Sequence, residues 1–184
     1  MSDNTDYGAL LRDALSASTK TDNLAPLLVD ALIVVTVSAC TLGVAMPSLL
    51  TGYTAMCLRI ARGEKVAVGD SMKGFERFGS TLVIGLLVLG LFVVASLLPL
   101  IGNVAALILA TWVWCVHIDR PDAGAVETLK ASVELVRGHP IDTLVLWLVA
   151  GGLGTLLSAT VIGSVVALAY GVMLTALMYR RWSF

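Results

Sequence analysis

The residues of this sequence that could carry catalytic or metal chemistry are few. The one compact ionisable cluster is the stretch "VHIDR", which contains His117, Asp119 and Arg120. A metal site needs several ligands at short spacing, and the two histidines and three cysteines of the chain are scattered. A phosphate-cradling Gly-rich loop with its lysine is also missing. We therefore predict no catalytic residue, no metal site and no cofactor, and interpret the cluster as an interfacial anchor beside Trp112 and Trp114.

A single carboxylate is predicted within an apolar segment. Asp30 follows Pro26 by about one helical turn, at the start of the first long charge-free stretch. An intramembrane carboxylate usually marks a functional site, which makes Asp30 a candidate intramembrane polar site. The membrane boundary is close enough for the side chain to reach water, so a structural interpretation stays open as well.

Basic residues gather in one segment, residues 59–77, which we call the basic loop. Each basic group near an anionic leaflet contributes about 1 kcal/mol to membrane attraction before screening by salt. The basic loop is therefore a candidate surface for anionic lipid or a protein partner. Alternatively, the same residues serve only to orient the chain by the positive-inside effect. The five candidate contacts are Arg59, Arg62, Lys65, Lys73 and Arg77.

The composition places these residues in a membrane protein. Hydrophobic residues make up 58% of the chain and charged residues 14%, whereas about a quarter of a soluble domain is charged. The mean hydropathy is +0.91, which also indicates an integral membrane protein. The opening residues 1–23 lack the pattern of a secretory signal, so we expect the first span to be retained. Expected partners are membrane lipids and a membrane protein or a second copy of the chain, with no nucleic acid.

Charge-free stretches predict an all-α integral membrane protein with six spans arranged as three hairpins. Tight turns are expected at Gly43–Pro47, Pro99–Asn103 and Thr160–Gly163. The second and fourth spans are short, because roughly sixteen residues at about 1.5 Å each reach only some 24 Å. The predicted spans are 27–42, 47–58, 81–98, 103–116, 143–159 and 162–178.

The distribution of Lys and Arg predicts the orientation. All twelve basic residues lie outside the three turns, so both termini are expected in the cytoplasm of a prokaryote, with the chain in the inner membrane. The domain organisation is then a cytoplasmic amphipathic segment at 1–23 and a membrane domain at 24–184. Further cytoplasmic amphipathic helices are predicted near 67–78 and 122–137.

A threefold internal repeat is suggested by the turns and the span ends. The turn motifs "LGVA", "IGNV" and "IGSV" recur at intervals of 59 and 61 residues. The basic residues Arg59, Arg120 and Arg180 end the second, fourth and sixth spans at intervals of 61 and 60. One unit of about sixty residues, an amphipathic helix followed by a hairpin, would explain both patterns. Coincidence among similar hairpins is the alternative.

The stretch "LLTGYTAMCLRIARGEKVAVGDSMKGFERFGSTLVIGLL", followed by "PLIG" and "AVETLKASVELVRGHP", resembles a known group. That group comprises poorly characterised prokaryotic six-helix membrane proteins, similar to the membrane domain beside some glycerophosphodiester phosphodiesterases. The resemblance covers about residues 49–178 and implies a bacterial-type cytoplasmic membrane location, with no activity attached. The matching positions are Gly52, Tyr53, Arg59, Arg62, Gly63, Glu64, Gly69, Asp70, Gly74, Phe75, Ala125, Ser132, Leu135 and Gly138.

The function expected from these features is that of a non-enzymatic membrane scaffold or accessory subunit. It would bind a protein partner or anionic lipid through its cytoplasmic face. The alternative is a small-solute or lipid transporter or channel, for which Asp30 and the threefold pattern are the motivation.

Overall fold

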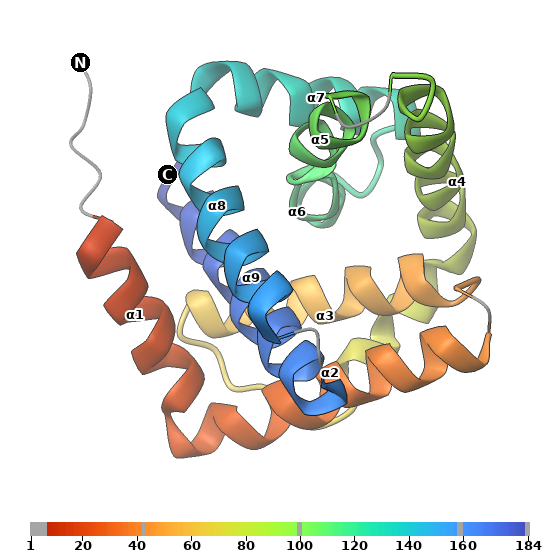
Figure 1. The fold of residues 1–184 in the computed structure, drawn as a ribbon. Coiled ribbons are helices and arrows are strands. Elements are labelled where there is room, and N and C mark those ends of the chain that lie inside the picture. The colour runs from red at the N-terminus through yellow and green to blue at the C-terminus, as the bar shows by residue number, and fades with distance from the viewer. Residues whose placement is uncertain (1–6, 42, 99–100, 158–159, 183–184) are drawn as a thin grey trace.

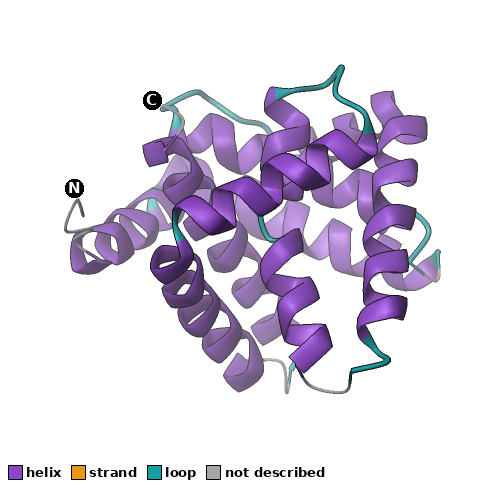
Figure 2. Cartoon of the chain, turned by 90° about the horizontal axis from the view of Figure 1, so that it is seen from above, coloured by secondary structure: helices purple, strands orange, loops and turns teal. Residues whose placement is uncertain are grey.

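The computed structural model describes residues 7–41, 43–98, 101–157 and 160–182 (Figure 1). Helices make up 85% of the structure, and no strand occurs within these ranges, which confirms the all-α class. Short loops connect most of the helices (Figure 2). The elements are α1 (Tyr7–Thr19), α2 (Thr21–Cys40), α3 (Met46–Ala61), the 3-10 helix η1 (Asp70–Arg77), α4 (Phe78–Ala95), α5 (Ile101–Ala110), α6 (Val113–Asp119), α7 (Ala125–Gly138), α8 (Pro140–Leu157) and α9 (Val161–Trp182).

Within the described residues, five segments are long and apolar enough to cross a membrane. Their outward surfaces are apolar as well: on α4, Leu86 and Leu89 are 58% exposed and Val93 is 63% exposed. An exposed apolar surface of this extent is typical of contact with lipid or with another protein. These features are compatible with an integral membrane protein. The five segments are Asp22–Cys40, Asp70–Ala95, Gly102–Asp119, Pro140–Leu157 and Ile162–Trp182.

The short helix α3 is the centre of the fold and is not among those five segments. It contacts α2, α4, α6, α9 and η1, and most of its side chains are buried, including Tyr53 and Met56. In Figure 1, α2 and α3 run across the molecule, whereas α5 and α6 are seen nearly along their axes. Because protein covers α3 on several sides, its backbone and side chains are shielded without a full-length span. Six spans and the threefold repeat stay predictions.

The predicted fourth span is broken into two helices. The chain leaves α5 at Ala110 and re-enters a helix at Val113. At the break Trp112 is fully buried, and its indole N–H donates to Thr143 Oγ1 at 3.3 Å. The prediction of Trp112 as an interfacial anchor is therefore wrong, because its ring packs inside the bundle. The carbonyl of Leu109 accepts a hydrogen bond of 2.6 Å from the hydroxyl of Ser132 on α7.

We expect Ser132→Ala to destabilise this break. The substitution removes the donor to a main-chain carbonyl and should lower the free energy of unfolding by about 1 kcal/mol. Thermal unfolding in mild detergent measures the effect. Ser80→Ala is the control, because Ser80 is exposed and its hydroxyl, among the described residues, donates to the carbonyl of Arg77 one turn earlier. An equal loss in both variants would show that the bond from Ser132 contributes nothing specific.

Several predicted boundaries are corrected by the structure. Helix α2 begins at Thr21, ahead of the predicted start at residue 27, so Asp30 lies well inside it. Helix α9 begins at Val161, and Thr160 Oγ1 accepts the Gly163 N–H at 3.0 Å, so the predicted turn at Thr160–Gly163 is mostly helix. A hydroxyl acceptor immediately before a helix is a normal N-cap. Residues 42, 99–100 and 158–159 of the predicted spans and turns lie outside the described residues.

The terminal helices pack on the core. Helix α1 lies within the predicted 1–23 segment, of which residues 1–6 lie outside the described part, and it contacts α2 and α9. At the other end, the guanidinium of Arg180 on α9 donates to the carbonyl of Ala61, the last residue of α3. A cation at a helix C-terminus satisfies a free carbonyl and complements the helix dipole. Arg180 of α9 thus caps the C-terminal end of α3.

Candidate functional site

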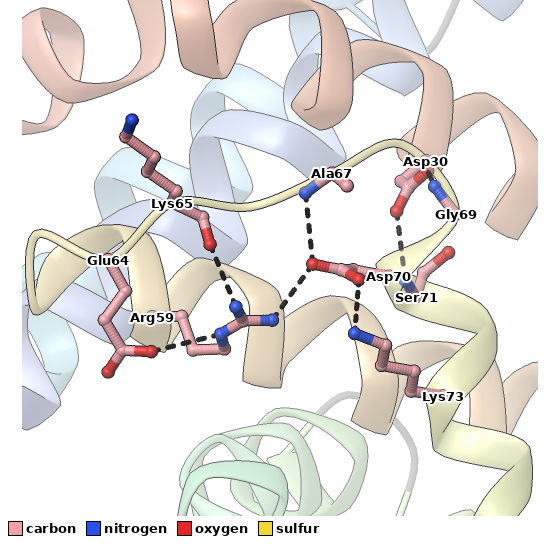
Figure 3. Close-up of polar contacts among 9 residues, drawn as sticks. All are labelled: Asp30, Arg59, Glu64, Lys65, Ala67, Gly69, Asp70, Ser71 and Lys73. Atoms are coloured by element: carbon pink, nitrogen blue, oxygen red, sulfur yellow. Dashed lines mark hydrogen bonds and ion pairs between the residues drawn. The ribbon is translucent and has the colours of Figure 1, made fainter.

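One arginine, Arg59, holds the basic loop against the C-terminal end of α3. Arg59 Nε bonds to Glu64 Oε2 at 3.1 Å, and its two terminal nitrogens bond to Asp70 Oδ2 and to the carbonyl of Lys65, each at 2.9 Å (Figure 3). A guanidinium presents five donors in a planar fork, which lets one side chain hold three acceptors. Arg59 therefore fixes the turn between α3 and η1.

Asp70 is the second hub of the loop. Its carboxylate accepts the N–H of Ala67 at 3.1 Å and pairs with Lys73 Nζ at 2.7 Å, in addition to Arg59 (Figure 3). The side chain is 9% exposed, so these contacts are shielded from water on most sides. A charged group with this little exposure is stable only when its oxygens are paired, as they are here.

Asp30 anchors the loop from α2. Its Oδ1 accepts the N–H of Gly69 at 2.7 Å, and its Oδ2 accepts the N–H of Ser71 at 3.0 Å (Figure 3). The carboxylate is completely buried. It therefore caps the N-terminus of η1, where the helix has free N–H groups and the positive end of its dipole. Gly69 has a φ of 92°, a left-handed conformation that suits glycine.

Two glycines bring η1 and α3 into direct main-chain contact. A Cβ atom built on Gly52 would overlap the carbonyl of Ser71 and lie 2.8 Å from the nitrogen of Gly74. A Cβ on Gly74 would overlap the carbonyl of Ser48. No side chain can be added at either position without moving the backbone. The close approach explains why η1 lies against α3 without a layer of side chains between them.

The five candidate basic residues fall into two groups. Arg59, Lys73 and Arg62 form ion pairs inside the molecule, the last with Asp119 Oδ1 at 2.9 Å. Lys65 and Arg77 are exposed, and neither forms an ion pair within the described residues. The structure therefore assigns the first three a part in shaping the loop and leaves Lys65 and Arg77 available to a ligand.

The "VHIDR" cluster is divided between the interior and the surface. His117 is only 1% exposed, whereas Asp119 and Arg120 are exposed. His117 is not an interfacial anchor, because its side chain is buried inside the helical bundle. Neither of its ring nitrogens has a hydrogen-bond partner among the described residues.

The second histidine, His139, lies between α7 and α8 and contacts α9. The ring of His139 stacks on Trp182 with 4.2 Å between centroids, and its Nδ1 is 3.6 Å from Asp142 Oδ2. The other oxygen of Asp142 accepts the Tyr7 hydroxyl at 2.6 Å. This hydrogen bond, followed by burial and the charge of Asp142, raises the pKa of Tyr7 above its ordinary value of 10.0. Tyr7 therefore stays a neutral donor that ties α1 to α8.

The positions of the described side chains do not indicate a metal site or a reactive thiol. Among the described residues, no three His, Cys, Asp or Glu side chains are grouped as metal ligands. Cys57 and Cys115 are buried free thiols, and Cys40 is an exposed one. A buried thiol of this kind acts as a small apolar side chain.

Sequence reasoning missed the partners of Asp30. Its two acceptors lie about forty residues from Gly69 and Ser71, and no local pattern connects them. The only signal was the "VGD" turn, in which a glycine precedes a helix start. In comparisons with family models, curated proteins and solved structures, the chain matched none.

Proposed function

We propose that the chain is a non-enzymatic membrane scaffold or accessory subunit that binds anionic lipid through the basic loop on its cytoplasmic face. One observation carries the proposal. The loop is held in a single shape by Asp30, Arg59 and Asp70, while Lys65 and Arg77 remain exposed and unpaired within the described residues. Because the loop is already ordered, its cations can bind an anionic surface with little further loss of conformational entropy.

The location and topology belong to the same proposal. With both termini in the cytoplasm, the basic loop lies on the inner leaflet, where anionic lipid is attracted by Lys and Arg. The order of elements is consistent with a threefold repeat, because α1, η1 and α7 precede α2 and α3, α4 and the broken helix α5–α6, and α8 and α9, respectively. The family resemblance over residues 49–178 is consistent with this arrangement and adds no activity.

The transporter alternative receives less support. It was motivated by the threefold pattern and by the carboxylate of Asp30, whose two oxygens accept main-chain N–H groups in a fully buried position. A carboxylate engaged in this way has no free acceptor directed at a substrate path. The binding function needs no such path, so it is the better explanation of the geometry.

Lipid retention tests the proposal directly. The protein is reconstituted in nanodiscs of equal phosphatidylglycerol and phosphatidylcholine, released, and analysed by native mass spectrometry for bound lipid. We expect enrichment of phosphatidylglycerol, reduced about tenfold in the double variant Lys65→Gln/Arg77→Gln, because each cation contributes about 1 kcal/mol before screening.

The matched control removes two other exposed cations, Lys20 and Lys130, with the same change to glutamine. This control should keep most of the enrichment if the basic loop is the binding surface. Equal losses in both double variants would mean that net charge alone attracts the lipid. A wild-type protein without any preference for phosphatidylglycerol would contradict the proposed function, and a stoichiometric protein retained instead would identify a partner as the ligand.

A further inference from the structure

His117 is a buried polar side chain whose hydrogen-bonding groups are unused within the protein. The residue is 1% exposed, and both ring nitrogens lack a partner among the described residues. A neutral imidazole carries one donor and one acceptor, and burying such groups unpaired is unfavourable. Native proteins rarely leave a buried polar side chain unpaired without a functional reason. A ligand that accepts a hydrogen bond from His117 would remove the penalty.

His117 lines a small half-open cavity, which we call the polar hollow after the charged side chains that also line it. It has a volume of about 240 Å³ and is lined by residues of α3, η1 and α6. Arg59, Lys73 and Arg77 also line it, together with the carboxylates of Asp70 and Glu76. Asp70 already pairs with Arg59 and Lys73. Arg77 lines the same cavity as His117, is exposed, and forms no ion pair within the described residues.

These donors suit an oxyanion. A phosphate group accepts hydrogen bonds from guanidinium and imidazole N–H groups, and bonds from charged donors are roughly twice as strong as neutral ones. The fork of Arg77 can bind two phosphate oxygens at once. The exposed Glu76 lies at the same cavity, which favours a phosphate with one negative charge over a more highly charged anion.

A larger apolar cavity is lined in part by the same two helices, α3 and α6. This apolar hollow has a volume of about 880 Å³ and is lined by residues of α3, α4, α5, α6, α8 and α9. Leu50, Leu89 and Trp114 contribute to its walls, and the small side chains of Ala167 and Gly171 on α9 leave it wide. Its size falls in the range of about 300–1,000 Å³ that is usual for small-molecule sites.

Helices α3 and α6 contribute different residues to each of the two hollows. On α3, Pro47 lines the apolar hollow, and Thr51, one turn later on the same face, lines the polar hollow. On α6, Trp114 lines the apolar hollow, and Ile118, one turn later, lines the polar hollow. In both helices the polar end is the end nearer the basic loop. A single molecule with an anionic head and an apolar tail would therefore contact both hollows.

We infer that the paired hollows bind one anionic phospholipid, with its phosphodiester at His117 and Arg77 and an acyl chain in the apolar hollow. The inference rests on the proposed function and deepens it, because it assigns the lipid to a built site rather than to the exposed surface of the loop. Charge complementarity at one end and an apolar wall at the other together select this occupant over a soluble anion or a peptide.

The headgroup contact is tested with His117→Phe and His117→Gln in the nanodisc assay described above. We expect His117→Phe to reduce phosphatidylglycerol retention about tenfold, because it removes a hydrogen bond to a charged group. No hydrogen bond of the free protein is lost, so thermal stability without lipid should stay at the wild-type level. His117→Gln keeps a donor and should retain more lipid than the phenylalanine variant. His139→Gln, at the stacked contact with Trp182, is the control and should retain lipid normally.

The tail contact is tested by filling the apolar hollow. Ala167→Phe places a ring in the cavity and should displace the acyl chain, with a loss of retention similar to that of His117→Phe. Val166→Phe adds the same ring at the neighbouring position, which is 39% exposed and does not line the hollow. Unchanged retention in Ala167→Phe would overturn the assignment of the tail.

Inorganic phosphate distinguishes the source of the oxyanion. It is added to lipid-depleted protein in detergent, and the melting temperature is compared with that after addition of phosphatidylglycerol. Stabilisation by the lipid and not by phosphate is expected, because phosphate lacks the apolar contacts. Equal stabilisation by phosphate would overturn the lipid assignment in favour of a free anion.

The two proposals fail in different ways. If His117→Phe retains phosphatidylglycerol normally while Lys65→Gln/Arg77→Gln loses it, the surface function stands and the built site is wrong. If the wild-type protein shows no preference for phosphatidylglycerol, both proposals are wrong.

Discussion

Gly52→Ala is expected to detach η1 from α3 and to lower the free energy of unfolding by about 3 kcal/mol. The added methyl group would overlap the carbonyl of Ser71 and lie 2.8 Å from the nitrogen of Gly74. Both are main-chain atoms, so no side chain can rotate to relieve the contact, and overpacking of this kind typically costs about 1–3 kcal/mol or more. Gly74→Ala should have a similar effect, because it meets the carbonyl of Ser48.

Thermal unfolding in detergent and hydrogen exchange of the basic loop measure this loss. Gly79→Ala is the matched control, since a methyl group there has no neighbour within 4 Å. In the first turn of α4 the control should be neutral or slightly stabilising, because alanine favours the helix over glycine. A Gly52→Ala variant with wild-type melting temperature and exchange would refute the close packing of α3 on η1.

Asp30→Ala should produce the second large effect. It leaves the N–H groups of Gly69 and Ser71 buried without an acceptor, and we expect a loss of about 4 kcal/mol for two such donors. For a chain of this length the melting temperature would fall by on the order of 10 °C. The start of η1 should also open, with faster hydrogen exchange at residues 66–72 and cleavage by added protease.

Asp30→Asn separates geometry from charge. The amide keeps the shape and one acceptor, so its stability should lie between those of the wild type and the alanine variant. Asp22→Asn is the control, because Asp22 lies on the same helix with an exposed side chain. Rapid exchange at residues 66–72 in the wild-type protein would contradict the anchoring role.

Much of the fold could be predicted from the sequence, because apolar stretches of the required length leave few alternatives in lipid. Five predicted spans correspond to segments apolar enough to cross a membrane, and helices occur where amphipathic segments were expected. The break at Thr111 and Trp112 could not be predicted, since it depends on Ser132 and Thr143 from later helices. Local propensity does not encode such tertiary contacts.

The candidate site was predicted only in part. Charge alone identified the basic loop, because Lys and Arg are concentrated there, but it could not separate the paired cations from Lys65 and Arg77. That distinction depends on carboxylates brought close by folding. The sequence places His117 at the membrane boundary, because the residue lies at the end of a predicted span. Its burial depends on the packing of η1 against α3, and the hydrophobic pattern of the sequence does not predict that packing.

The contact between Arg180 and the end of α3 has a consequence for biogenesis. A ribosome makes α3 well before α9, because the cation that closes the end of α3 lies 119 positions further along the chain. Until α9 has been made, the terminal carbonyl of Ala61 must accept a hydrogen bond from another donor, such as water. The central helix therefore gains its C-terminal partner only after several later helices have been synthesised.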